Sequence, residues 1–212
     1  MNAMRVSNKC YSRDLRSIEL ARRMLRLEAR TETICAWTGL TGDRVRNLSR
    51  VLAREGVRCC AARQRGPSPS KFSALMASPS LRKEAPAIAG ICRVFDVIPP
   101  QPRPDARTAL PGVVRGERLC EALELFRQLV PGARMTLEKL VLLVFTVATG
   151  ESWALAYCAG CQATILIDRL ELSRRLCSYC DARRGREEIA ARDSALTLEC
   201  ETTETFVQQS LF

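Results

Sequence analysis

Histidine is missing from all 212 residues of this chain. Without an imidazole there is no Ser-His-Asp triad, no Cys-His dyad and no histidine-ligated metal site, so any transition-metal ligands must be thiolates or carboxylates. Aromatic residues are scarce, at 5% of the chain, and leave few platforms on which single-stranded bases could stack. Because the remaining residues do not combine into a nucleophile, a base and an orienting group, the sequence favours a protein that is not an enzyme.

Long apolar segments are missing as well. The longest runs from Leu140 to Ala148, nine residues with Thr146 inside it, whereas a membrane span needs roughly 20 residues. The N-terminal residues contain no apolar stretch typical of a secretory signal. We therefore expect a cytoplasmic protein with no membrane partner, whose eleven cysteines are thiols or metal ligands rather than a disulfide framework.

Positive charge is abundant but unevenly placed. The chain holds 33 Lys and Arg against 23 Asp and Glu, a net charge of +10. Residues 1–65 contain 15 basic and 6 acidic residues, a net charge of +9, and the remaining residues are almost neutral. A basic block of this kind is the electrostatic signature of a polyanionic partner.

Helical periodicity dominates the sequence. Apolar residues at helical spacing predict helices over residues 14–30, 31–37, 43–55, 116–130 and 137–149. Thr136 is the expected N-cap of the last helix and Gly150 its expected end, and its apolar residues nearly encircle it, as in a buried core helix. Nine of the ten prolines fall between Pro67 and Pro111, so this middle segment is expected to be largely irregular, with one short helix between Ser80 and Val97.

Four cysteines form the pattern C-x2-C-x15-C-x2-C, namely Cys158, Cys161, Cys177 and Cys180. Two residues between cysteines let a tight turn aim both sulfurs at one ion, and two such turns complete the tetrahedron of a structural zinc site. We expect one structural Zn²⁺ per chain, with residues 163–167 and 170–172 as a strand hairpin between the pairs. Two disulfides or a redox C-x-x-C are the alternatives, and the other seven cysteines are expected to be small buried hydrophobes.

Residues 31–50 fit a helix-turn-helix. Cys35 is the small residue of the first helix and Gly39 the turn glycine, while Ile34, Leu40, Val45 and Leu48 would lock the helices together. The second helix carries side chains suited to phosphates and base edges, which are Arg44, Arg46, Asn47, Arg50 and Arg54. An ordinary helical hairpin with a solvated basic face is the alternative. The arginines of helix 14–30, Arg22 and Arg23 among them, are expected to contact phosphates or solvent.

Three stretches together resemble the FlhC family of flagellar transcriptional activator subunits. They are the basic segment from Arg16 to Leu48, the Gly/Pro/Ser turn at residues 65–70, and the helix Leu137–Gly150 that leads into the cysteine quartet. The resemblance implies a helical protein with zinc held by those four cysteines. It also implies a hetero-oligomer with an FlhD-like subunit that binds double-stranded promoter DNA and activates flagellar operons through RNA polymerase.

The predicted fold class is therefore mostly α, with an N-terminal helical domain containing the helix-turn-helix and C-terminal helices leading into a small zinc-ribbon-like lobe. The predicted regions are the basic helical segment 1–65, the Pro-rich linker 66–115, the helical core hairpin 116–157, the zinc lobe 158–182 and the tail 183–212. The leading functional hypothesis is a sequence-specific DNA-binding activator. A zinc-stabilised protein–protein adaptor without specific DNA readout comes second, and an RNA- or ribosome-associated zinc-ribbon protein third.

Overall fold

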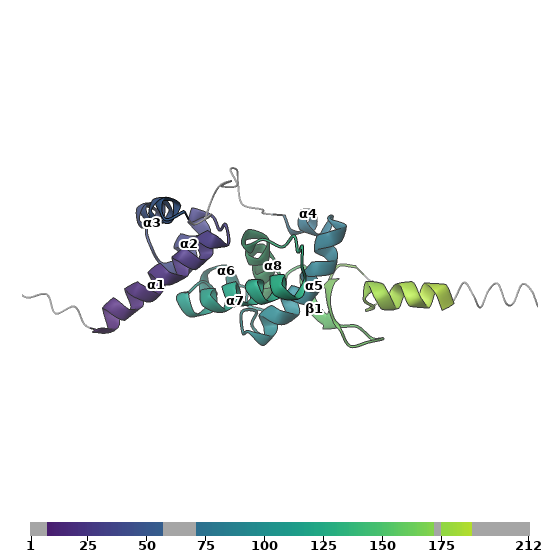
Figure 1. Cartoon of the computed structure of the whole chain (residues 1–212). Helices are drawn as coiled ribbons and strands as arrows, with labels where there is room; N and C mark the ends of the chain where they lie inside the picture. Colours follow the sequence, from purple (N-terminus) through teal and green to yellow (C-terminus); the bar gives the residue numbers. More distant parts are fainter. Residues whose placement is uncertain (1–7, 57–70, 172–174, 188–212) are drawn as a thin grey trace, which may run out of the picture. The chain divides into compact units, whose positions relative to one another are not determined.

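A computed structural model describes residues 8–56, 71–171 and 175–187 of the chain (Figure 1). Contacts divide it into two compact units, of which the first is Met1–Leu155 with Leu166–Leu172 and the second is Ala156–Ile165 with Ser173–Phe212. The predicted fold class is confirmed, because the described chain is mostly helical and carries one strand pair and a four-cysteine lobe. Of the predicted tail 183–212, residues 183–187 are helical and residues 188–212 lie outside the described residues.

The helices and strands follow one another in a simple order. They are α1 (Asn8–Arg26), α2 (Thr31–Thr38), α3 (Gly42–Arg54), α4 (Phe72–Met76), α5 (Pro79–Val94), α6 (Ala106–Ala109), α7 (Val113–Leu129), α8 (Leu137–Thr149), β1 (Trp153–Tyr157) and β2 (Thr164–Asp168). Residues 178–187 are also helical. In the described part of the chain, no helix combines the length and the apolar character needed to cross a bilayer.

Helix α8 forms the centre of the first unit. Thr136 precedes it and accepts a hydrogen bond from the Lys139 amide, and Gly150 ends it with φ 66°, so both predicted ends are confirmed. Nine of its residues are buried, namely Leu137, Glu138, Leu140, Val141, Leu142, Leu143, Val144, Val147 and Ala148. The prediction of a buried core helix is therefore correct, and the neighbouring helices α4, α5, α6 and α7 pack against it.

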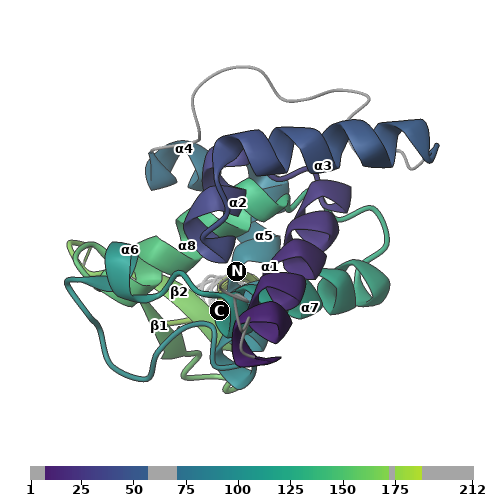
Figure 2. The same cartoon turned by 90° about the vertical axis from the view of Figure 1, so that its left-hand side faces the viewer.

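Helices α1, α2 and α3 pack on one another, and α1 also packs along α7 (Figure 2). The approach of α7 to this group is close at Gly116, where a Cβ atom would lie 2.7 Å from Leu20 Cδ2. Met24 and Trp37 also line this contact and are almost fully buried. The three N-terminal helices are therefore part of the same hydrophobic core as α7 and α8.

The middle segment differs from the prediction of a largely irregular linker. It contains α4, α6 and the 16-residue helix α5. Helix α5 begins at Pro79, where a missing amide proton costs nothing, and it tolerates Pro86 within its length. Its buried side chains recur at helical spacing, and they are Leu81, Ala85, Ile88, Ala89 and Cys92. The position of α5 agrees with the one short helix predicted between Ser80 and Val97, whereas α4 and α6 are not predicted from the sequence.

The strand pair also differs from the prediction. Strand β2 contains most of the predicted segment 163–167, but its partner is β1, which precedes the first cysteine pair, and not 170–172. Trp153 and Leu155 of β1 pack against the helical core, and the Trp153 ring meets Phe72 edge-on at 5.1 Å. Burial of these side chains explains why β1 rather than the exposed segment after Asp168 forms the second strand.

We predict that Gly150→Ala destabilises the protein more than Gly132→Ala. Both glycines have positive φ, 66° and 79°, so alanine should cost about 1–2 kcal/mol at either position. At Gly150 a Cβ atom would also lie 2.7 Å from Pro102 Cβ, whereas nothing lies within 4 Å at Gly132. Overpacking should add about 1–3 kcal/mol at Gly150 only, measured as the difference in free energy of unfolding in urea. Equal losses for the two variants would contradict the close packing of Pro102.

Candidate metal centre and helix-turn-helix

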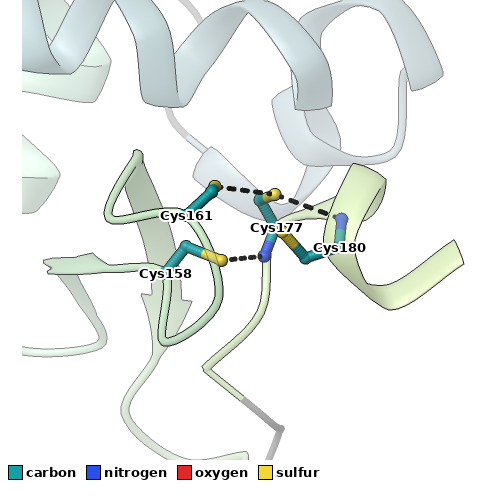
Figure 3. A group of neighbouring side chains, drawn as sticks. All are labelled: Cys158, Cys161, Cys177 and Cys180. Carbon is teal, nitrogen blue, oxygen red and sulfur yellow. Dashed lines mark hydrogen bonds between the residues drawn. The ribbon is translucent and has the colours of Figure 1, made fainter. Parts of the chain in front are cut away.

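The four cysteine sulfurs of the C-x2-C pairs converge on one point (Figure 3). All four Sγ atoms lie within 4.8 Å of one another, and those of Cys161 and Cys177 are 3.7 Å apart. A tetrahedron with metal–sulfur bonds of about 2.3 Å has sulfurs about 3.8 Å apart. The arrangement can therefore hold one metal ion with four thiolate ligands, as the spacing predicts.

The first pair is shaped by a tight turn after β1. The Cys158 amide donates to the Ala163 carbonyl at 2.8 Å, and the Gln162 amide donates to the Cys158 carbonyl at 2.9 Å. Gln162 adopts φ 62° to close this turn. Inside it, a Cβ atom on Gly160 would lie 3.1 Å from Cys180 Sγ, so a residue without a side chain lets the two pairs approach.

One amide–sulfur hydrogen bond joins the second pair to the first, and another forms within the second pair. The Cys177 amide donates to Cys158 Sγ at 3.2 Å, and the Cys180 amide donates to Cys177 Sγ at 3.4 Å (Figure 3). The Ala159 amide also donates to the Arg175 carbonyl at 2.8 Å. Amides directed at sulfur stabilise negative charge there, which is what metal-binding thiolates require.

Hydrogen bonds at sulfur also make the pKa values of the clustered cysteines differ from one another. The Cys177 amide, aided by the Gly160 and Cys161 amides, lowers the pKa of Cys158 to about 6. Hydrogen bonds with the Cys161 and Cys177 thiols raise the pKa of Cys180 to about 12. Four adjacent sulfurs do not all ionise without a counter-charge, and a divalent cation supplies that charge. All four cysteines are free, so the alternative of two disulfides has no support here.

Among the described residues, Cys92 and Cys120 lie outside the cluster. Burial raises the pKa of both Cys92 and Cys120 to about 12, and they pack as small apolar side chains, as predicted. Cys35 is half-buried against the core. Cys59, Cys60 and Cys200 lie outside the described residues.

The helix-turn-helix geometry follows the prediction closely. Gly39 ends α2 with φ 73°, and its amide donates to the Cys35 carbonyl. Thr41 then caps α3 by accepting a hydrogen bond from the Arg44 amide at 3.4 Å. The two helices are thus joined by a left-handed turn at Gly39, as the sequence predicts, and by a start of α3 that Thr41 caps.

The predicted apolar lock between the helices is also in place. Ile34, Leu40 and Val45 are buried, and Leu48 is partly buried against the same core. Sequence reasoning missed Trp37, which is 1% exposed and whose ring centroid lies 6.2 Å from that of Phe145 in α8. The sequence offered a signal for it, because Trp37 falls three residues after the buried Ile34 on the same helix face.

All five predicted DNA-contacting side chains of α3 are exposed, but they are not equivalent. Asn47, Arg50 and Arg54 follow helical spacing on one face, opposite the buried Val45 and Leu52. No other described residue forms an ion pair with Arg50 or Arg54. These three residues therefore form an exposed basic stripe, which we call the α3 stripe.

The other two predicted side chains lie beside acidic groups. Arg46 pairs with Asp43 at 2.7 Å, one turn earlier on the same helix. Arg44 lies 3.9 Å from Asp14 of α1. The positive charge of both is partly compensated within the protein, although such exposed pairs are weak.

Two arginines of α1 form ion pairs with glutamates of α7. Arg16 makes two hydrogen bonds to Glu117 of α7, and Arg23 makes two to Glu124 at 2.6 and 2.9 Å. The hydrogen bond to Glu124 raises the pKa of Arg23 further above its usual range. Arg16 keeps an exposed side chain, as expected, and Arg23 a partly exposed one, but both also pair with carboxylates of α7, which the sequence does not predict.

No protein-family model, curated protein or solved structure matches this chain.

We predict that the purified protein carries one metal ion per chain and that Cys177→Ser greatly reduces its metal content. Serine replaces a sulfur ligand with a hydroxyl that does not bind as a thiolate. Elemental analysis of protein dialysed without chelator gives the stoichiometry. Cys35→Ser is the matched control, because Cys35 lies on α2 and should leave the metal content unchanged. A wild-type protein that is folded and free of metal would contradict the assignment.

Proposed function

We propose that this protein is a zinc-stabilised, sequence-specific double-stranded DNA-binding transcription activator. The observation that carries this proposal is the α3 stripe, in which an exposed helix after a helix-turn-helix turn presents Asn47, Arg50 and Arg54 together. In helix-turn-helix proteins the second helix enters the major groove, so the stripe occupies the position of a base-reading surface.

The chemistry of the stripe suits base recognition. An arginine can donate two hydrogen bonds to the O6 and N7 atoms of guanine, and an asparagine can pair with the N6 and N7 atoms of adenine. Asn47 is exposed on α3, where it follows the ion-paired Arg44 and Arg46 and precedes Arg50. Its side-chain amide is therefore available to a base edge. Arg54, at the C-terminal end of α3, is placed further along the helix and is assigned to a phosphate.

Backbone contacts would come from arginines that remain outside the internal ion pairs. Arg22 and Arg26 are exposed on α1, whereas Arg16 and Arg23 are hydrogen-bonded to glutamates of α7. Neutralised phosphates release counterions, so binding through these groups weakens as salt rises.

The metal proposed for the cysteine cluster is zinc. Zn²⁺ favours a tetrahedral set of four thiolates, and such a closed set leaves no position for a substrate. The ion would then act as a structural link between the turn after β1 and the helical residues 178–187, and not as a catalyst.

The partners proposed are an FlhD-like subunit in a hetero-oligomer and RNA polymerase at a promoter. The resemblance of residues 16–48, 65–70 and 137–150 to the FlhC family supports them, together with the cysteine quartet. Flagellar operons are the targets that this resemblance suggests, and the cytoplasm is the corresponding compartment.

We predict distinct effects for two stripe variants in duplex-binding measurements, once a preferred sequence has been selected from random DNA. Asn47→Ala should lower discrimination at one base pair by about 1–3 kcal/mol, since one base edge loses its partner. Arg54→Ala should weaken all sequences similarly and reduce the salt slope by about 1. Fluorescence anisotropy between 50 and 200 mM salt, a range of roughly fourfold, separates the two effects.

The control variant is Lys83→Ala, which removes one exposed positive charge from α5, outside the helix-turn-helix. It should change neither discrimination nor the salt slope. If selection from random DNA enriches no sequence, specific readout is wrong. Assembly with an FlhD-like subunit in that case would favour the protein–protein adaptor.

A further inference from the structure

A single carboxylate interrupts the apolar surface of α8. Glu138 is only 5% exposed, and it is the charged member of the otherwise apolar buried set of this helix. A carboxylate removed from water destabilises a fold unless hydrogen bonds compensate for the lost hydration. The partners of Glu138 therefore indicate what this side chain does.

Two hydrogen-bond donors to Glu138 belong to the start of α2, the first helix of the helix-turn-helix. Glu138 Oε1 accepts a hydrogen bond from the Arg30 amide at 2.8 Å, and Oε2 accepts one from the Thr33 hydroxyl at 3.0 Å. Both carboxylate oxygens are thus bound to a segment more than 100 residues earlier in the chain. A negative charge also interacts favourably with the positive end of the α2 dipole.

Helix α2 needs such a partner because its own sequence does not provide a cap. Arg30 is the N-cap residue, with extended backbone angles, and its side chain makes no capping hydrogen bond. Serine, threonine, aspartate or asparagine would usually occupy this position and bind the free amides. Glu138, from a different helix, instead supplies acceptors at this helix start for the Arg30 amide and the Thr33 hydroxyl.

The opposite end of α2 also contacts α8. Trp37, near the end of α2, faces Phe145, which lies two turns after Glu138 on α8. One polar and one aromatic contact therefore attach α2 to the same helix near both of its ends. Two separated points of attachment define the direction of α2. Because the short turn from Gly39 to the N-cap Thr41 joins the two helices, the orientation of α2 also determines that of α3.

We infer that Glu138 is a positioning residue for the helix-turn-helix, which fixes the start of α2 on the core helix α8 and thereby the placement of the α3 stripe. The expected effect of Glu138 on DNA affinity rests on the proposed function. Its expected effect on the stability of α2 does not, and the two effects can be measured separately.

The test uses the full-length chain with Glu138→Gln. The amide retains one oxygen acceptor but places an NH₂ group where a second donor points, so one hydrogen bond is lost and two donors face each other. Hydrogen exchange followed by mass spectrometry should show exchange of the α2 amides accelerated by about tenfold, with α7 unchanged as the internal reference. Affinity for the selected duplex should fall by about three- to tenfold, with metal content unchanged.

A second pair of variants keeps the charge and guards against a general loss of folding. Thr33→Val removes the hydroxyl donor to Oε2, whereas Thr33→Ser keeps it. The valine variant should reproduce part of the faster exchange in α2, and the serine variant should resemble the wild type. Rescue by serine distinguishes the hydrogen bond from side-chain packing.

Unchanged α2 exchange in both Glu138→Gln and Thr33→Val would overturn the inference. Acceleration of α2 and α7 to the same extent would also overturn it, because Glu138 would then be a general stabilising group. If α2 alone is accelerated while the wild type prefers no duplex sequence, the positioning role of Glu138 is supported and the proposed DNA readout has failed.

Discussion

A helix that is apolar on nearly every side must be covered by other elements, and α8 imposes this requirement on the first unit. Its buried side chains are in contact with α4, α5, α6 and α7, and its two ends are set by Thr136 and Gly150. Water would otherwise meet a continuous apolar surface, which is the dominant cost that folding removes. The short helices of the Pro-rich middle, including α4 and α6, exist as stable elements because they cover this surface.

The same requirement explains why one acidic residue on α8 is informative. An apolar side chain in place of Glu138 would satisfy the hydrophobic demand as well, so the carboxylate is present for the partners that it binds. Buried polar groups of this kind define a unique orientation, because a shifted helix leaves them unsatisfied. The start of α2 is thereby placed by hydrogen bonds, while the contacts of α2 with α1, α3 and α7 are made by less directional apolar packing.

Local signals in the sequence predicted well, and long-range pairings did not. Some helix ends depend on local residues, namely the C-cap glycines Gly39 and Gly150 and the N-cap threonines Thr41 and Thr136. The glycines act through their own backbone angles and the threonines through an amide three residues away, so each can be assigned from the neighbouring sequence. The cysteine quartet was predictable because tetrahedral geometry constrains its spacing. The bond from Glu138 to Arg30 and the pairing of Arg23 with Glu124 connect residues more than 100 positions apart, where no periodicity relates the partners. Strand β1 was missed because its role depends on packing against the helical core.

Those long-range ion pairs change the meaning of the basic N-terminal segment. Its net charge of +9 counts every arginine alike, but Arg16 and Arg23 neutralise carboxylates of α7 and hold two helices side by side. Arg46 faces Asp43 on its own helix. A polyanion therefore meets fewer free cations than the composition implies, and those of residues 11–56 include the α3 stripe and the exposed positions of α1. Formal charge overstates the number of phosphates such a surface can neutralise, because part of the basic block acts inside the fold.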